Sequence, residues 1–169
     1  MSDTRNAVQK APLFKNLDDH EISEVLNITT EKRVHKEHLI MQEGDEGSTM
    51  YILLEGELKV SKALTMKFGG EDIRKAEKVL SSLRAQDHVL LVGEMALIAN
   101  EKRSASIMAQ AECLLLEIRR DDFMRLIETK PSLGVKVLLN LAELLTARLR
   151  HSDENVIRLT TALSIALSR

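Results

Sequence analysis

The apolar positions of the chain change their spacing twice. Over residues 14–30, Leu17, Ile22, Val25 and Leu26 recur at helical spacing, which predicts a short helix that Asp18 or Asp19 caps. Over residues 31–120 the apolar residues stand in short or alternating runs between glycines, and we expect β-strands there. From residue 121 the helical spacing returns and continues nearly to the end of the chain.

One polar stretch interrupts the strand region. Residues 61–78 contain two adjacent glycines and predict a long hairpin connection. Further strands are expected at residues 79–83, 89–92, 106–110 and 113–118. A helix, many short strands and a long helix indicate an α+β fold, a small β barrel or roll with flanking helices. We expect one domain with an N-terminal helical segment, a β region and C-terminal helices, at residues 1–30, 31–120 and 121–169.

The last helical region carries a heptad seam. Its members alternate three and four residues apart: Val135, Leu138, Ala142, Leu145, Leu149, Ser152, Val156, Leu159, Leu163 and Ala166. Only Ser152 is polar. A lone helix of this length exposes the seam, whereas pairing with a second copy buries it, so we predict a homodimer through this helix. The alternative is that the first half packs on its own domain and the tail frays.

The composition limits the chemistry of the chain. Its 169 residues are 44% apolar and 30% charged, as in one soluble globular domain. One tyrosine, three phenylalanines and no tryptophan argue against a cleft that stacks bases between rings. Lysine and arginine number 24 against 26 acidic residues, which is not the footprint of a nucleic-acid binder. The single Cys113, with no signal peptide or membrane-length apolar run, predicts a cytoplasmic protein without a membrane partner.

One segment of the strand region carries the candidate chemistry. Among the ten residues 89–98, Glu94 is the only charged one, and a carboxylate in such surroundings needs a partner. Gly93 permits a close backbone approach, and the next residues predict one helical turn whose N–H groups seat an anion. Arg103 and Ser104 suit a phosphate, while a carboxylate suits ribose hydroxyls. These residues together indicate a nucleotide site, and the alternative is that Glu94 and Arg103 pair only with each other.

Over roughly residues 13–155 the chain resembles the cyclic nucleotide-binding domain family. The segments that carry the resemblance are LFKNLDDHEI, IMQEGDEGSTMYILLEGELKV, GEMALIANEKRSAS and LLLEIRRDDFMRLIETKP. The third is similar to the phosphate-binding cassette of the family, and we call residues 93–106 the cassette. The resemblance implies an eight-stranded β roll of the jelly-roll type with an N-terminal helix and a long C-terminal helix. It also implies a regulatory sensor that is not an enzyme, as in catabolite-activator-type regulators and kinase regulatory subunits.

The resemblance also implies ligand residues. Glu94 would accept the ribose 2′-hydroxyl, Arg103 would pair with the cyclic phosphate, and Ser104 would hold other phosphate oxygens. In the family the base is capped from the long helix, at the positions of Ser152 and Asp153. The full expected set is Gly93, Glu94, Met95, Ala96, Leu97, Arg103, Ser104, Ala105, Ser152 and Asp153. The expected ligand is cAMP first and cGMP second, with no catalytic residue, cofactor or metal.

The segment before the cassette departs from the family pattern. Gln86 stands where the family usually has glycine, no aromatic residue follows, and about three extra residues separate Asp87 from Glu94. A reshaped pocket leaves open a sensor of another nucleotide, such as a cyclic dinucleotide. A protein-interaction scaffold of the same fold, with Glu94 and Arg103 as a structural pair, is the other alternative. Since no helix-turn-helix fits after the long helix, we expect a stand-alone module that signals to an effector protein not yet identified.

Overall fold

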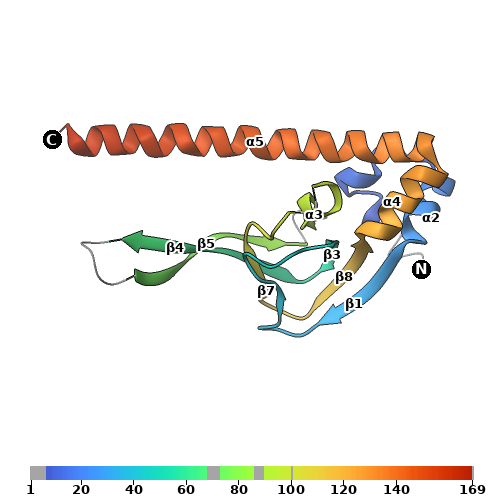
Figure 1. Cartoon of the computed structure of the whole chain (residues 1–169), viewed down its shortest axis with the longest axis horizontal. Helices are drawn as coiled ribbons and strands as arrows, with labels where there is room; N and C mark the ends of the chain where they lie inside the picture. Colours follow the sequence, from blue (N-terminus) through green and yellow to red (C-terminus); the bar gives the residue numbers. More distant parts are fainter. Residues whose placement is uncertain (1–6, 68–72, 86–89, 100, 169) are drawn as a thin grey trace.

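The structure, a computed structural model, describes residues 7–67, 73–85, 90–99 and 101–168 (Figure 1). The helices are η1 (Pro12–Phe14), α2 (Asp19–Leu26), α3 (Met95–Ile98), α4 (Arg120–Thr129) and α5 (Pro131–Leu167). The strands are β1 (Thr29–Val34), β2 (Leu39–Met41), β3 (Thr49–Glu55), β4 (Glu57–Lys67), β5 (Ile73–Arg84), β6 (Leu90–Val92), β7 (Ser106–Ala109) and β8 (Cys113–Arg119). The chain is therefore α+β, as the sequence predicts.

The strands form two antiparallel sheets of four. One sheet has the order β1-β8-β3-β6 and the other β2-β7-β4-β5. The two sheets face each other as a sandwich with helices on one side (Figure 1). Within the described strands no ladder joins one sheet to the other, so the closed eight-stranded roll that the resemblance implies is not confirmed.

Strand β3 shows how the apolar pattern builds two layers of core. Met50 and Ile52 point toward the helices, where they pack with Leu97 and Phe123. Tyr51 and Leu53 point into the space between the two sheets. Both faces of β3 are thus buried, which explains why its sequence is almost continuously apolar rather than alternating.

The expected hairpin connection at residues 61–78 is wrong in its extent. The β4–β5 ladder continues from the pair Glu57–Arg84 to the pair Lys67–Ile73, so most of that polar stretch is strand. The connection falls within residues 68–72, outside the described residues. A two-stranded ladder is held by main-chain hydrogen bonds, and these leave no apolar signature in the sequence.

The single helix expected over residues 14–30 is also wrong in its extent. The chain forms the short η1 and α2 instead, and β1 already begins at Thr29. Asp18 caps α2, because its side chain accepts from the N–H of Glu21 while the Glu21 side chain accepts from the N–H of Asp18. The buried amide of Asn140 on α5 donates to the carbonyls of Leu13 and Lys15 and so ties η1 to α5.

Helix α5 has two parts with different surroundings. Leu133, Val137 and Leu141 are buried against the domain, and Gly134 lies close to Ile127 on α4. From residue 146 to residue 168 every residue is exposed except one that is half-buried. Figure 1 shows this second part extending past the other helices, in the direction of the β4–β5 hairpin. None of the described helices is apolar enough over a sufficient length to span a membrane.

Candidate functional site

The cassette begins with a sharp turn that only glycine adopts easily. Strand β6 ends at Val92, and Gly93 follows with a φ of +78°. A Cβ at Gly93 would lie 2.6 Å from Nη1 of Arg103 and 2.6 Å from the methyl carbon of Met41. Gly93 therefore gives the left-handed turn and the space for the arginine at the same position.

The short helix α3 follows this turn. Glu94 occupies its N-cap position and is only 5% exposed, and Leu97 points into the core. The N–H groups of Ala96 and Leu97 already donate to the carbonyls of Gly93 and Glu94. The sequence predicted that N–H groups of this turn bind an anion. Among them, the N–H groups of Glu94 and Met95 donate no backbone hydrogen bond in the described part of the chain.

Arg103 is fixed by neutral oxygen atoms. Its Nη1 donates to the carbonyl of Thr49 at 2.7 Å and to that of Gly93 at 3.5 Å. Its Nη2 donates to the Thr49 hydroxyl at 2.8 Å. Burial lowers the pKa of Arg103, while Tyr51, Asp45 and Glu94 act in the opposite direction. A guanidinium remains charged under such conditions, so the site holds an oriented cation.

The backbone around Arg103 is attached to a second loop. The N–H of Gly44 donates to the Arg103 carbonyl at 2.9 Å, and the Arg103 N–H donates to the Asp45 carbonyl at 2.8 Å. The arginine side chain then crosses directly over Gly47, where a Cβ would lie 2.4 Å from its Nε. The loop of residues 42–47 thus positions both the main chain and the side chain of Arg103.

Glu94 has its ion pair with α5. Its Oε1 lies 2.6 Å from Nη1 of Arg148, and Nη2 of Arg148 donates to the Leu91 carbonyl at 2.6 Å. The exclusive Glu94–Arg103 pair that the sequence left open is not among the ion pairs of the described residues. Because one guanidinium contacts both β6 and Glu94, the site is linked directly to the long helix.

These residues surround a cavity of about 430 Å³, within the range of small-ligand sites. Seven of the ten expected residues line it: Gly93, Glu94, Met95, Ala96, Arg103, Ser104 and Ala105. Leu97 is buried in the core instead, and the exposed Ser152 and Asp153 are not part of the lining. Arg148 and His151 line the cavity from α5. Apolar side chains complete the wall, among them Val60 and Leu83.

Gly47, Thr49, Arg148 and His151 are among the residues of the site that the sequence did not identify. Gly47 and Thr49 act by proximity to Arg103, which no local pattern shows. Arg148 and His151 stand four residues and one residue before Ser152. An i, i+4 relation places Arg148 on nearly the same helix face as Ser152, and this spacing could have identified it.

A polar chain continues from Arg103 into the sandwich. The Thr49 hydroxyl lies 3.4 Å from the Tyr51 hydroxyl, and Glu117 pairs with Lys32 beyond it. Burial opposes the ionisation of Glu117, but hydrogen bonds from Lys32 and Tyr51 and the charge of Lys32 outweigh it. The pKa of Glu117 consequently lies below its usual value.

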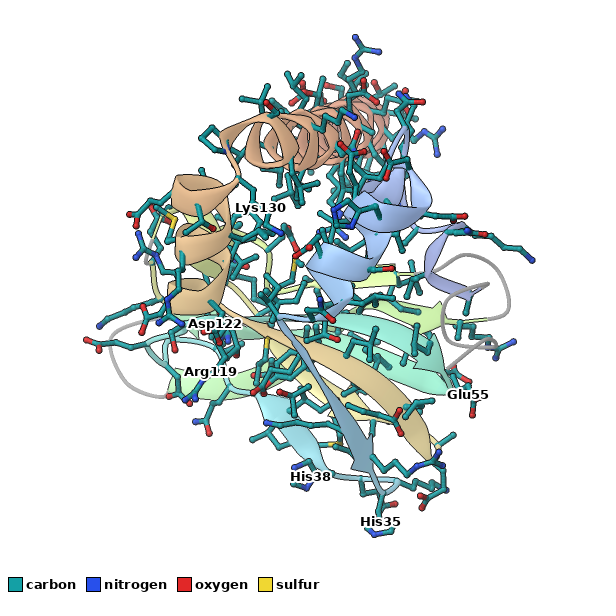
Figure 2. All side chains as sticks on the ribbon, turned by 90° about the vertical axis from the view of Figure 1, so that its right-hand side faces the viewer. His35, His38, Glu55, Arg119, Asp122 and Lys130 are labelled. Atoms are coloured by element: carbon teal, nitrogen blue, oxygen red, sulfur yellow. The ribbon has the colours of Figure 1, made fainter. Side chains whose placement is uncertain are left out.

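The described residues offer no metal cluster of three or more histidine, cysteine or acidic side chains. His35 pairs with Glu112 at 2.9 Å, and Figure 2 places His35 and His38 at the end of the sheets opposite α5. Cys113 is buried, and burial raises the pKa of its thiol, so a reactive thiolate is disfavoured.

The chain is similar in sequence to known proteins. The family model of the cyclic nucleotide-binding domain matches residues 31–130. The cyclic AMP receptor protein of Thermus thermophilus is 31% identical over 143 residues, which are 85% of this chain and 59% of that protein. Human cGMP-dependent protein kinase 2 is 29% identical over 128 residues, 74% of this chain but 15% of the kinase. The chain thus spans less than two thirds of the length of these relatives.

A solved structure extends the similarity to the fold. The cyclic nucleotide-binding domain from Methylobacillus flagellatus is 27% identical and superposes with a TM-score of 0.76 over 92% of this chain and 82% of that one. The matched residues 31–130 include both sheets except the first two residues of β1, and they include the cassette with Gly93, Glu94 and Arg103. The chain belongs to the cyclic nucleotide-binding domain family.

Proposed function

We propose that the chain is a cytoplasmic sensor that binds a cyclic mononucleotide, cAMP in preference to cGMP, in the cavity beside α3. The observation that carries the proposal is the presence of Glu94 and Arg103 in the lining of one cavity. A carboxylate accepts hydroxyl protons, and a guanidinium binds a phosphate with directed bonds. The two groups together match a ligand that carries a ribose hydroxyl and one anionic phosphate.

The hydrogen bonds of Arg103 support phosphate binding. A guanidinium has five N–H donors, and the bonds to Thr49 and Gly93 use three of them. The two donors left among the described contacts are Nε–H and one Nη2–H, which lie side by side. This pair is the fork that binds two oxygens of one anion. The bonds to Thr49 thus orient the guanidinium without using the edge that a phosphate needs.

Glu94 retains capacity for a sugar hydroxyl. Its Oε1 accepts from Arg148, and an ionised carboxylate has about four acceptor positions on its two oxygens. A ribose 2′-hydroxyl that donates to Glu94 would therefore add to the Arg148 pair rather than displace it. In this binding mode the ligand stabilises a contact between the cassette and α5, and α5 carries the signal to an effector protein.

Ligand titration on the full chain tests the proposal. We expect cAMP and cGMP at millimolar or lower concentration to raise the melting temperature, because a ligand at about 100 times its dissociation constant adds about 2.7 kcal/mol to stability. 5′-AMP, which lacks the cyclic phosphate, should give a much smaller shift. A shift with a cyclic dinucleotide alone would support the other sensor, and no shift with any of the four would support the scaffold.

We further propose a homodimer through α5. Val156, Leu159 and Leu163 belong to the seam and are exposed by more than half. A seam this apolar is stable in water when a second copy covers it. The expected dimer brings the two α5 helices together, so a ligand that contacts α5 would change the helix arrangement.

Charge in the seam should dissociate this dimer. We expect the double variant Val156→Glu and Leu163→Glu to scatter light as one chain at tens of micromolar, where the natural chain scatters as two. The matched control is Thr161→Glu, an exposed position of the same helix outside the seam. If the natural chain is a monomer with and without cyclic nucleotide, the dimer proposal is wrong.

A further inference from the structure

A row of polar side chains leads away from Arg103 along one face of the β1-β8-β3-β6 sheet. Thr49 and Tyr51 stand two residues apart on β3, so their side chains point to the same face of the strand. Glu117 on β8 is the direct cross-strand partner of Tyr51. Lys32 on β1 forms an ion pair with Glu117 at the far end of the row. Three neighbouring strands therefore connect the cassette arginine to a buried carboxylate.

The two inner members of the row are almost fully buried. Tyr51 and Glu117 are each only 8% exposed, and a buried phenol or carboxylate needs hydrogen-bond partners. The ion pair with Lys32 and the hydrogen bond from Tyr51 keep the pKa of Glu117 below its usual value. An ionised carboxylate can only accept, so the proton of the Tyr51 hydroxyl points toward Glu117.

The donors and acceptors of the row fit one direction of donation. A guanidinium can only donate, so the Thr49 hydroxyl accepts from Nη2 of Arg103 at 2.8 Å. The Thr49 proton is then directed to the Tyr51 hydroxyl, whose oxygen lies 3.4 Å away. Each hydroxyl thus turns a lone pair toward Arg103 and its proton toward Glu117. Hydrogen bonds in such a chain polarise one another.

This direction makes the Thr49 hydroxyl a fixed acceptor for Arg103. Without the Tyr51 hydroxyl, the Thr49 proton has no other acceptor among the described contacts and is free to rotate toward Nη2 of Arg103. The same Nη2 carries one of the two donors of the phosphate fork, so its orientation affects the bond to the ligand. Because 3.4 Å is long for a hydroxyl pair, we expect an effect of several-fold on affinity rather than a hundredfold effect.

We propose that Tyr51 is a positioning residue for the cyclic phosphate and acts on Arg103 through the Thr49 hydroxyl. The proposal rests on the proposed function, because it requires a cyclic nucleotide in the cavity. In Tyr51→Phe, which removes the hydroxyl and keeps the ring, the dissociation constants of cAMP and cGMP should both rise at least about fourfold in calorimetry on the full chain. Their ratio should stay within about twofold of the natural value, since the row reaches the phosphate and not the base.

A double-mutant cycle tests whether this effect passes through Thr49. Thr49→Val removes the hydroxyl and keeps a branched side chain. In that background Tyr51→Phe should change affinity by less than about twofold, whereas two independent contributions would add in full. The matched control is Thr29→Val on β1, which removes a hydroxyl that donates to the Leu26 carbonyl at 2.8 Å and should leave affinity unchanged.

A spectroscopic signal reports on the row directly. Tyr51 is the single tyrosine of the chain, so tyrosine labelled at Cζ with the NMR-active isotope of carbon gives one signal that needs no assignment. Saturating cAMP should shift this signal in the natural chain and shift it much less in Thr49→Val, which lacks the hydroxyl link.

The outcomes separate the role of Tyr51 from the sensor function. Natural affinity of Tyr51→Phe for both nucleotides overturns the positioning role and leaves the sensor function intact. An equal loss of affinity on Tyr51→Phe with and without the Thr49 hydroxyl also overturns it, because the ring environment would then be responsible. A loss in Thr29→Val as large as that in Tyr51→Phe has the same consequence, since affinity would follow stability alone. Absence of cAMP and cGMP binding by the natural chain overturns the sensor function as well.

Discussion

Replacing Arg103 by alanine should weaken cyclic nucleotide binding strongly while the domain remains folded. The guanidinium supplies the positive charge and the donor fork for the phosphate, and truncating one partner of such a pair costs about 2–5 kcal/mol. This range corresponds to an increase in the dissociation constant of about 30-fold to about 4,000-fold. Isothermal titration calorimetry with cAMP and cGMP measures the effect.

The bonds of Arg103 to Thr49 predict a smaller effect on the unliganded protein. Arg103→Ala removes donors from a carbonyl and a hydroxyl at the start of β3, which we expect to lower the free energy of unfolding by about 1–3 kcal/mol. Arg103→Lys keeps a positive charge but loses the fork of two N–H donors. Its affinity for cyclic nucleotides should therefore lie between that of the natural chain and that of Arg103→Ala.

Arg125→Ala is the matched control for Arg103→Ala. Arg125 is an exposed arginine on α4 that pairs with Asp122, away from the cavity, and its loss should leave affinity unchanged. Equal affinity of Arg103→Ala and the natural chain would contradict the phosphate assignment.

The strands and the cassette could be predicted because burial imposes a pattern on the sequence. In β3, both faces of the strand are covered, so Met50 to Leu53 are all apolar. Glu94 stood out for the same reason, since an isolated charge within an apolar run is costly to bury. Its burial and its ion pair with Arg148 show that the signal was physical, although the sequence offered Arg103 as the alternative to a ligand and did not indicate Arg148.

The α5 wall of the cavity could not be predicted from the heptad seam. A seam identifies the apolar face of a helix, and Ser152 drew attention as its one polar member. The face that lines the cavity is decided by how α5 is rotated on the domain. That rotation is fixed by contacts far apart in sequence, such as Arg148 with the Leu91 carbonyl and Asn140 with that of Leu13. The spacing from Ser152 could indicate Arg148, but it does not contain the rotation of α5 on the domain.

Alanine substitutions at two glycines of the loop of residues 42–47 should distinguish the positioning of Arg103 from the stability of the loop. In Gly47→Ala the new Cβ would lie 2.4 Å from Nε and 2.5 Å from Cζ of Arg103, so the guanidinium must move. A side chain can move without unfolding the loop, and the backbone of Gly47 is not in the left-handed region. We therefore expect affinity for cyclic nucleotides to fall at least about tenfold, with little change in the free energy of unfolding.

Gly44→Ala should have the opposite effects. Nothing lies within 4 Å of a Cβ at Gly44, but its φ is +89°, a conformation that costs alanine about 1–2 kcal/mol. Its N–H still donates to the Arg103 carbonyl, so affinity should be retained while urea denaturation shows the lower stability. If Gly44→Ala and Gly47→Ala both lose affinity in proportion to their loss of stability, then the affinity depends on the folded loop and not on the space above Gly47. If Gly47→Ala binds normally, the observed orientation of Arg103 is not the one that the ligand requires.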